Sequence, residues 1–163
     1  MNLRPYRPAD APALLALFKD TIRRVNARDY DEAQIRAWAS DEIDESVWAS
    51  RFEGRFTAVA EEAGKPVGFL ELESDGHIDR TYVAADFQRR GAGRMLLEAA
   101  LAEARSRGIG RLYTEASITA RPFFEAHGFT LLAPQTVECR GQRFVNFRME
   151  RQMDGNSGDE KSR

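Results

Sequence analysis

The sequence is poor in the residues that disulfides and metal sites require. Its single cysteine, Cys139, cannot form an intrachain disulfide, which is typical of a protein from a reducing compartment. The two histidines, His77 and His127, lie far apart, and no Cys or second His stands at a ligand spacing from either. We therefore expect no metal cofactor, and we interpret Cys139 as a small buried residue rather than a nucleophile.

Long apolar runs and an excess of basic charge are also missing. No run approaches the roughly 20 apolar residues that span a bilayer, and residues 1–8 lack the apolar stretch of a signal peptide. The net charge of −2 argues against general nucleic-acid binding, which needs a strongly basic face. We expect a cytoplasmic protein that binds neither membranes nor nucleic acids.

The chain is long enough for one domain with a substantial core, since 42% of its 163 residues are hydrophobic. Its periodicity predicts helices over residues 11–25, 31–38, 44–52, 91–107 and 119–126. Strands are predicted over residues 3–7, 56–62, 66–73, 77–83, 111–117, 129–139 and 143–149. This order predicts an α/β (α+β) domain over residues 1–150, built on one mixed sheet. Residues 151–163 form a polar tail that we expect to be disordered.

The stretch from residue 82 to residue 97 carries the clearest functional signal. It reads as the end of a strand, a loop of sequence Gln-Arg-Arg-Gly-Ala-Gly, and the start of a long helix. Glycine lets a backbone approach a ligand closely, and a helix start offers unpaired N–H groups and partial positive charge. Three arginines, Arg89, Arg90 and Arg94, surround the same point. The pattern favours a phosphate or pyrophosphate site, although a simple turn before a surface helix fits the loop alone equally well.

Two common phosphate-binding motifs do not fit this loop. Neither glycine is followed by Lys-Ser or Lys-Thr, so it is not a Walker loop, and Leu96 stands where a dinucleotide fingerprint needs a third small residue. The loop does resemble the Gln/Arg-x-x-Gly-x-Gly/Ala motif of the GNAT acetyltransferase superfamily. A second stretch, residues 117–129, resembles that family's Asn-x-x-Ala-x-x-x-Tyr-x-x-x-Gly-Phe signature. Residues 76–80 and 114–124 are similar to a bacterial YafP-like branch of the family.

The resemblance implies a GNAT fold, with a mostly antiparallel sheet of six to seven strands flanked by helices on both faces. It also implies an acetyl-CoA site, in which loop N–H groups hold the pyrophosphate and the preceding strand holds the pantetheine and the thioester carbonyl. An N–H of that strand, at Tyr82 or Val83, would stabilise the oxyanion of a tetrahedral intermediate. The residues implied for acetyl-CoA are Tyr82, Val83, Gln88, Arg89, Arg90, Gly91, Ala92, Gly93, Arg94, Ser117, Ala120, Phe123 and Phe124.

This sequence departs from the family pattern at two positions. Ser117 replaces the signature Asn, and Phe124 replaces the Tyr that often protonates the leaving thiolate. Phe124 cannot donate a proton, so Ser117, Tyr113 or a water molecule remains as the acid. A thiol with a pKa of about 8.5 needs little help to leave near neutral pH.

A base is also needed, because only the neutral form of an amine attacks. The strand candidates are His77 and Asp79, which alternate onto one face, and Glu71 and Glu73 on the adjacent strand. His77 has the better pKa for the task, although His77 and Asp79 also fit the closing of the Asp-Gly turn before them. Glu71 and Glu73 also fit a solvated strand face.

The acceptor pocket is expected from the first helices and their connecting loop. Its candidate residues are Asn26, Arg28, Asp29, Tyr30, Trp38 and Trp48, with Glu71 as a further contact; the aromatic residues among them also fit a role as core anchors. Arg121 fits either a CoA phosphate, an acidic substrate group or a surface ion pair.

The resemblance implies an enzyme that acetylates a small-molecule amine by direct attack in a ternary complex. Two alternatives remain: acetylation of a protein N-terminus or lysine, and a CoA-binding sensor or toxin-neutralising partner without turnover. A homodimer through the terminal hairpin is one expected assembly.

Overall fold

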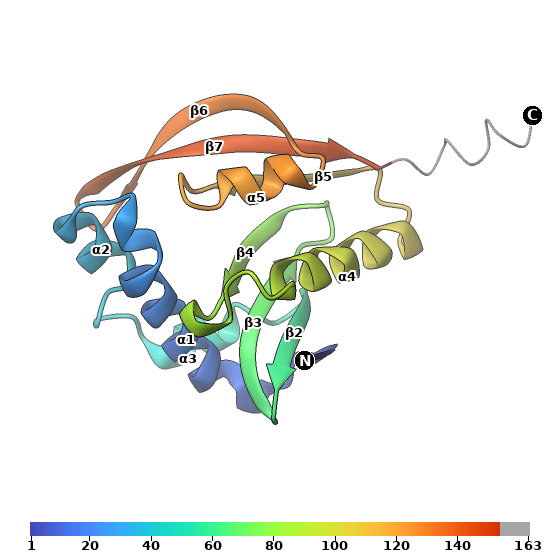
Figure 1. The fold of residues 1–163 in the computed structure, drawn as a ribbon, viewed down its shortest axis with the longest axis horizontal. Coiled ribbons are helices and arrows are strands. Elements are labelled where there is room, and N and C mark those ends of the chain that lie inside the picture. Colours follow the sequence, from blue (N-terminus) through green and yellow to red (C-terminus); the bar gives the residue numbers. More distant parts are fainter. Residues whose placement is uncertain (154–163) are drawn as a thin grey trace, which may run out of the picture.

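The computed structural model describes residues 1–153, which form seven strands and five α-helices (Figure 1). The strands are β1 (Asn2–Pro5), β2 (Phe56–Glu62), β3 (Lys65–Leu72), β4 (Ile78–Val83), β5 (Arg111–Ala116), β6 (Thr130–Cys139) and β7 (Gln142–Gln152). The α-helices are α1 (Ala11–Arg24), α2 (Glu32–Trp38), α3 (Glu45–Ser50), α4 (Ala92–Ser106) and α5 (Arg121–Ala126). The predicted order of helices and strands is confirmed. Because β7 continues to Gln152, the domain ends slightly later than residue 150, and residues 154–163 of the predicted tail lie outside the described part.

The strands form two antiparallel sheets, in the orders β1-β2-β3-β4 and β5-β7-β6. The predicted single sheet is therefore split between β4 and β5. These two strands meet only at one end, through a parallel bridge between His77 and Tyr113. Gly76 permits this approach, because a Cβ there would lie 2.1 Å from the carbonyl oxygen of Arg111. Beyond the bridge the two strands diverge and leave a gap.

A β-bulge in β4 accompanies this divergence. Leu70 pairs with Thr81 and Leu72 pairs with Ile78, so Asp79 and Arg80 together stand opposite a single residue of β3. A bulge bends its strand and increases the local twist. The bulge thus explains why β4 turns away from β5 just after the bridge.

Helices cover both faces of the first sheet, as predicted. On one face, α4 packs through Leu96, Leu97 and Ala100 against Leu70 and Leu72 of β3. On the other face, residues of α1 and α3 pack against Val59 and Phe69. The period-two alternation of β3 places Leu70 and Leu72 on one face and Phe69 on the other, which is why both cores form on one strand.

The β6–β7 hairpin arches over α5 and reaches α2 (Figure 1). Two hydrogen bonds fix its far end to that helix. Gln34 Nε2 donates to the carbonyl oxygen of Arg143 at 2.8 Å, and Arg140 Nη1 donates to the carbonyl oxygen of Ala37 at 2.8 Å. The hairpin and α2 therefore enclose the space beside β5. No helix within residues 1–153 has the length and apolarity needed to cross a membrane.

Candidate active site

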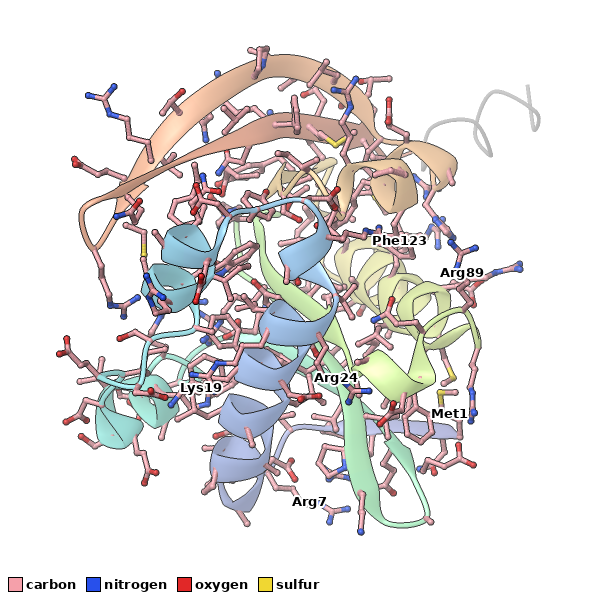
Figure 2. All side chains as sticks on the ribbon, turned by 60° about the vertical axis from the view of Figure 1, so that its left-hand side comes forward. Met1, Arg7, Lys19, Arg24, Arg89 and Phe123 are labelled. Atoms are coloured by element: carbon pink, nitrogen blue, oxygen red, sulfur yellow. The ribbon has the colours of Figure 1, made fainter. Side chains whose placement is uncertain are left out.

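The start of α4 has the geometry of an anion site. Gly91 adopts a φ of 86° at the N-cap, where no side chain caps the helix. The first N–H groups of a helix lack intrahelical partners, so they remain available to a ligand. Arg89 is exposed and reaches outward from the ribbon at this point (Figure 2). Arg90 lies over the ring of Phe87 at 4.9 Å, while Arg94 pairs with Glu98 at 3.1 Å.

Gly93 brings this helix start against α5. A Cβ at Gly93 would lie 3.0 Å from Cε1 of Phe123, which is tighter than nine in ten real Cβ contacts. Phe123 in turn lines a cavity in the gap between β4 and β5. The helix start and the cavity are therefore adjacent, which is the arrangement that a long ligand with a phosphate at one end requires.

The cavity between β4 and β5, called here the central cavity, has a volume of about 200 Å³. It brings together most of the residues expected to meet the acyl donor. These are Tyr82, Val83, Gln88, Ser117, Ala120, Phe123 and Phe124. The carbonyl oxygen of Val83 accepts hydrogen bonds from Gln88 Nε2 at 2.6 Å and Thr21 Oγ1 at 3.3 Å, so the end of β4 is held firmly.

Ser117 lies at the end of β5, where the chain turns into α5. Its Oγ accepts a hydrogen bond from the N–H of Ala120 at 3.0 Å, which leaves its own proton available. Tyr30 lies beside it, with its hydroxyl oxygen accepting the N–H of Ile118 at 2.9 Å. Burial raises the pKa of Tyr30, so its hydroxyl stays protonated near neutral pH.

Phe124, which stands at the family's tyrosine position, and Tyr113, one of the candidate acids, have other roles in the structure. Phe124 is buried and packs against Phe129 at 5.0 Å between ring centroids, as part of the core. Tyr113 donates its hydroxyl proton to Asp75 and stacks on His77 at 4.8 Å. Neither residue offers a proton to the central cavity.

His77 stands between two carboxylates rather than at the cavity wall. Its Nδ1 lies 2.6 Å from Glu73 Oε1, and its Nε2 lies 2.7 Å from Glu115 Oε1. Burial lowers the pKa of His77, but the two hydrogen bonds outweigh it, and the net pKa is raised. A ring with both nitrogens facing carboxylates is suited to carry a proton, so the predicted role as the direct base does not fit this geometry.

Asp79 and Glu71 belong to a cluster of ion pairs. Asp79 lines the central cavity, but its carboxylate pairs with Arg55 at 2.5 Å and Arg51 at 3.2 Å. Burial raises the pKa of Asp79, and the hydrogen bond and charge of Arg55 reverse this effect, so the net pKa is lowered and Asp79 is a poor base. Glu71 is fully buried and pairs with Arg80, which lies 4.1 Å over the ring of Trp48. The predicted contact of Glu71 with an acceptor is therefore replaced by a structural role.

A second cavity of about 190 Å³, called here the outer cavity, adjoins the first. Trp38, Glu115 and Ser117 line both cavities, so the two are continuous at these residues. Of the residues predicted for the acceptor, Tyr30 and Trp38 line the outer cavity and Asn26 lines the central one. Arg28 is 60% exposed and pairs with Asp29, so the structure does not bring it to either cavity.

Trp48 is a core anchor. It is buried, and its Nε1–H donates to the carbonyl oxygen of Ala11 at 3.0 Å. This contact fixes α3 against α1 and leaves no polar group of Trp48 for a ligand.

Glu115 is the functional candidate that sequence reasoning missed. It lies two residues before Ser117 on β5, so strand alternation places both side chains on one face. That spacing was the available signal. Asn146 and Phe144 of the outer cavity had no such signal, because only the pairing of β5 with β7 brings them beside Ser117.

The comparisons with known proteins agree with this geometry. The family model described as an acetyltransferase (GNAT) domain matches residues 26–151. The chain belongs to the GNAT acetyltransferase family. It is an N-acetyltransferase by this membership, as predicted.

Individual GNAT proteins resemble the whole chain. YafP of Escherichia coli (strain K12), an uncharacterized N-acetyltransferase, is 36% identical over 149 residues, covering 91% of this chain and 94% of YafP. A GCN5-related N-acetyltransferase from Rhodopseudomonas palustris superposes with a TM-score of 0.89 and 38% identity, over 93% of this chain and 94% of that one. The PaiA N-acetyltransferase of Thermoplasma acidophilum, solved with coenzyme A, gives a TM-score of 0.73 at 17% identity, over 93% and 98% of the two chains. The predicted likeness to the YafP-like branch is confirmed.

Proposed function

We propose that this GNAT protein transfers an acetyl group from acetyl-CoA to the primary amine of a small molecule, in a ternary complex. Acetyl-CoA supplies a thioester, an acyl group already activated for attack. The uncapped start of α4, with Arg89 and Arg90, would hold the pyrophosphate. The bound coenzyme A of the Thermoplasma neighbour supports this ligand. No metal is needed for this reaction, and residues 1–153 contain no group of three or more His, Cys, Asp or Glu arranged to hold one.

The observation that carries the proposal is the position of Glu115. Its side chain lines both the central cavity and the outer cavity, and so stands where donor and acceptor would meet. Glu115 takes a proton from the acceptor ammonium, and the freed amine attacks the thioester carbon. His77 holds the Glu115 carboxylate in place through the 2.7 Å contact. His77 is thus a positioning residue. Its other ring nitrogen, Nδ1, contacts the partly exposed carboxylate of Glu73.

Ser117 supplies the proton that the leaving thiolate needs. The amine adds to the thioester carbonyl carbon and forms the C–N bond of a tetrahedral intermediate. As this intermediate collapses, the C–S bond breaks, the Ser117 hydroxyl donates its proton to the sulfur, and the nitrogen releases its second proton to solvent. The Tyr30 hydroxyl lies beside Ser117, where it accepts the N–H of Ile118, and it can replace the proton that Ser117 gives up. Ser117 and Tyr30 together thus protonate the leaving thiolate, which Phe124 cannot do.

A small acceptor is favoured over a protein because the loop after α1 is fastened across the site. Tyr30 is fixed to the N–H of Ile118 at 2.9 Å, and Asp29 accepts a hydrogen bond from Thr119 Oγ1 at 2.7 Å. Both contacts join the loop to the segment between β5 and α5. An acceptor polypeptide needs an open groove, whereas these contacts hold the loop against the segment that follows Ser117.

The test is a thiol-release assay with acetyl-CoA and a panel of small amines. We expect turnover by the wild type, and a loss in kcat of about 10²-fold or more in Glu115→Gln. Glu138→Gln, an exposed carboxylate on β6, is the matched control and should keep wild-type turnover. Binding of CoA without turnover of any amine would point instead to the sensor alternative, and turnover of peptides alone would point to protein acetylation.

A further inference from the structure

The outer cavity contains features that define its occupant beyond the proposed reaction. It lies between Tyr30, Trp38 at the end of α2, and the face of the second sheet that carries Glu115 and Phe144. Its volume of about 190 Å³ exceeds the roughly 150 Å³ of an apolar cavity that binds benzene. One six-membered ring with a short side arm therefore fits it, with the arm extending toward Ser117.

Three aromatic rings form one wall of this cavity. Tyr30 and Trp38 pack edge to face at 5.2 Å between centroids, and Phe144 lies 5.8 Å from each of them. At these separations the rings touch one another and leave no space between them for a ligand atom. They form a continuous apolar surface, against which a flat apolar group gains the most contact.

The polar groups of the outer cavity are concentrated near Ser117. Asn146 precedes Phe147, whose register partner is Ala116, so Asn146 lies beside Ser117 on the neighbouring strand. Its Oδ1 is buried and has no hydrogen-bond partner among the described residues. An unpaired buried amide oxygen is destabilising, so it favours a ligand that brings a hydrogen-bond donor. Glu115 adds a negative charge on the same side.

The charge of the lining is one-sided. Glu115 is its one formally charged residue among those described, and no Lys or Arg contributes to the wall. A ligand carboxylate placed here would face Glu115 without a cation to pair with. The lining therefore favours a simple amine and disfavours the zwitterion of the corresponding amino acid.

We propose that the acceptor is a primary ammonium carried on a single-ring apolar body without a carboxylate, bound in the outer cavity with Asn146 Oδ1 and Glu115 holding the ammonium. This inference rests on the proposed acetyl transfer. Asn146 acts before the chemistry: it accepts one N–H of the ammonium and aims the nitrogen at the acyl group, while Glu115 accepts the proton that is lost. The aromatic wall of Tyr30, Trp38 and Phe144 holds the ring.

The first arm of the test compares three probes in the thiol-release assay: 2-phenylethylamine, phenylalanine and spermidine. We expect kcat/KM for 2-phenylethylamine to exceed that for phenylalanine on the order of 100-fold, because the added carboxylate meets Glu115. Spermidine should be a poorer substrate than 2-phenylethylamine, since it cannot use the aromatic wall. Preference for spermidine or for phenylalanine would overturn the inference while leaving the acetyl transfer intact.

The second arm changes Asn146. Asn146→Leu should raise KM for 2-phenylethylamine about tenfold or more, because the ammonium loses a charge-assisted hydrogen bond. Asn146→Asp keeps an oxygen acceptor and should restore a KM near or below that of the wild type. Gln135→Leu, at the register partner of Asn146 on β6, should leave KM unchanged. In all three variants the affinity for acetyl-CoA should be unchanged, which shows that the fold is preserved.

The outcomes distinguish a failure of the inference about the acceptor from a failure of the proposed acetyl transfer. An unchanged KM in Asn146→Leu, with turnover of amines retained, overturns the inference alone. Binding of acetyl-CoA without thiol release from any amine overturns the proposed function, and the inference with it.

Discussion

The imidazole Nε2 of His77 lies 2.7 Å from the Glu115 carboxylate, and its Nδ1 lies 2.6 Å from that of Glu73. His77 therefore links the exposed turn before β4 to the carboxylate that lines both cavities. The imidazole serves this link best when it is protonated and donates from both nitrogens. One interaction thus connects the stability of the bridge between the two sheets with the position of the proposed base.

The stability of the protein should depend on the protonation of His77. The net pKa of His77 is raised above its usual value of about 6.5, because the hydrogen bonds to Glu73 and Glu115 outweigh burial. The stabilisation is then fully present below about pH 6.5 and is lost as the pH rises through the folded-state pKa. Urea unfolding across this range should show a falling free energy of unfolding in the wild type and a flatter profile in His77→Gln. Parallel profiles for the two proteins would contradict this prediction.

Gly91→Glu should abolish acetyl-CoA binding, which we expect to be micromolar in the wild type. The new carboxylate would repel the pyrophosphate at the uncapped start of α4, and a φ of 86° strains any residue with a Cβ. Gly108→Glu is the matched control, because Gly108 has a φ of 70° and equally open surroundings at the other end of α4. Calorimetry should show loss of binding in the first variant and wild-type binding in the second. Equal binding by both variants would exclude a pyrophosphate site at Gly91.

Ser117→Ala should lower kcat about tenfold or more, with little change in the affinity for acetyl-CoA. Tyr30→Phe should give a smaller loss, since Ser117 still carries its own proton. Tyr113→Phe serves as the control, because the Tyr113 hydroxyl donates to Asp75 and lies away from the cavities. Steady-state rates at several pH values would test the order of these effects. A larger loss in Tyr113→Phe than in Ser117→Ala would assign the acid to Tyr113.

Glu71→Gln should destabilise the protein by about 3 kcal/mol without changing KM for the amine. Glu71 and Arg80 are both buried and form an ion pair. The substitution therefore leaves the charge of Arg80 buried without this carboxylate partner. Glu32→Gln removes an exposed helix-surface partner of Arg36 and should change stability by less than about 1 kcal/mol. Chemical denaturation would measure both changes. A raised KM for the amine in Glu71→Gln, with unchanged stability, would indicate that Glu71 contacts the acceptor.

Local patterns in the sequence were sufficient for the start of α4 and for the order of the elements. The loop of residues 88–91 and the start of α4 are continuous in the chain, so the glycine spacing and the arginines by themselves predict an anion site there. The Asp31–Gln34 capping box at α2 is likewise local, and both of its hydrogen bonds form. Hydrophobic periods of 2 and 3.6 residues located the strands and helices for the same reason.

The identity of the base and the shape of the acceptor site were decided only by the tertiary structure. The sequence placed Glu71, His77 and Asp79 on strands, but it did not show that Arg80 and Arg55 neutralise two of them. Glu115 meets His77 because a bridge joins β4 to β5, and Asn146 lies beside Ser117 because β7 inserts between β5 and β6. These contacts join residues about 30 to 40 positions apart, where pairing depends on the packing of whole sheets. Strand order and the bulge in β4, rather than any local pattern, thus determine which side chains line the cavities.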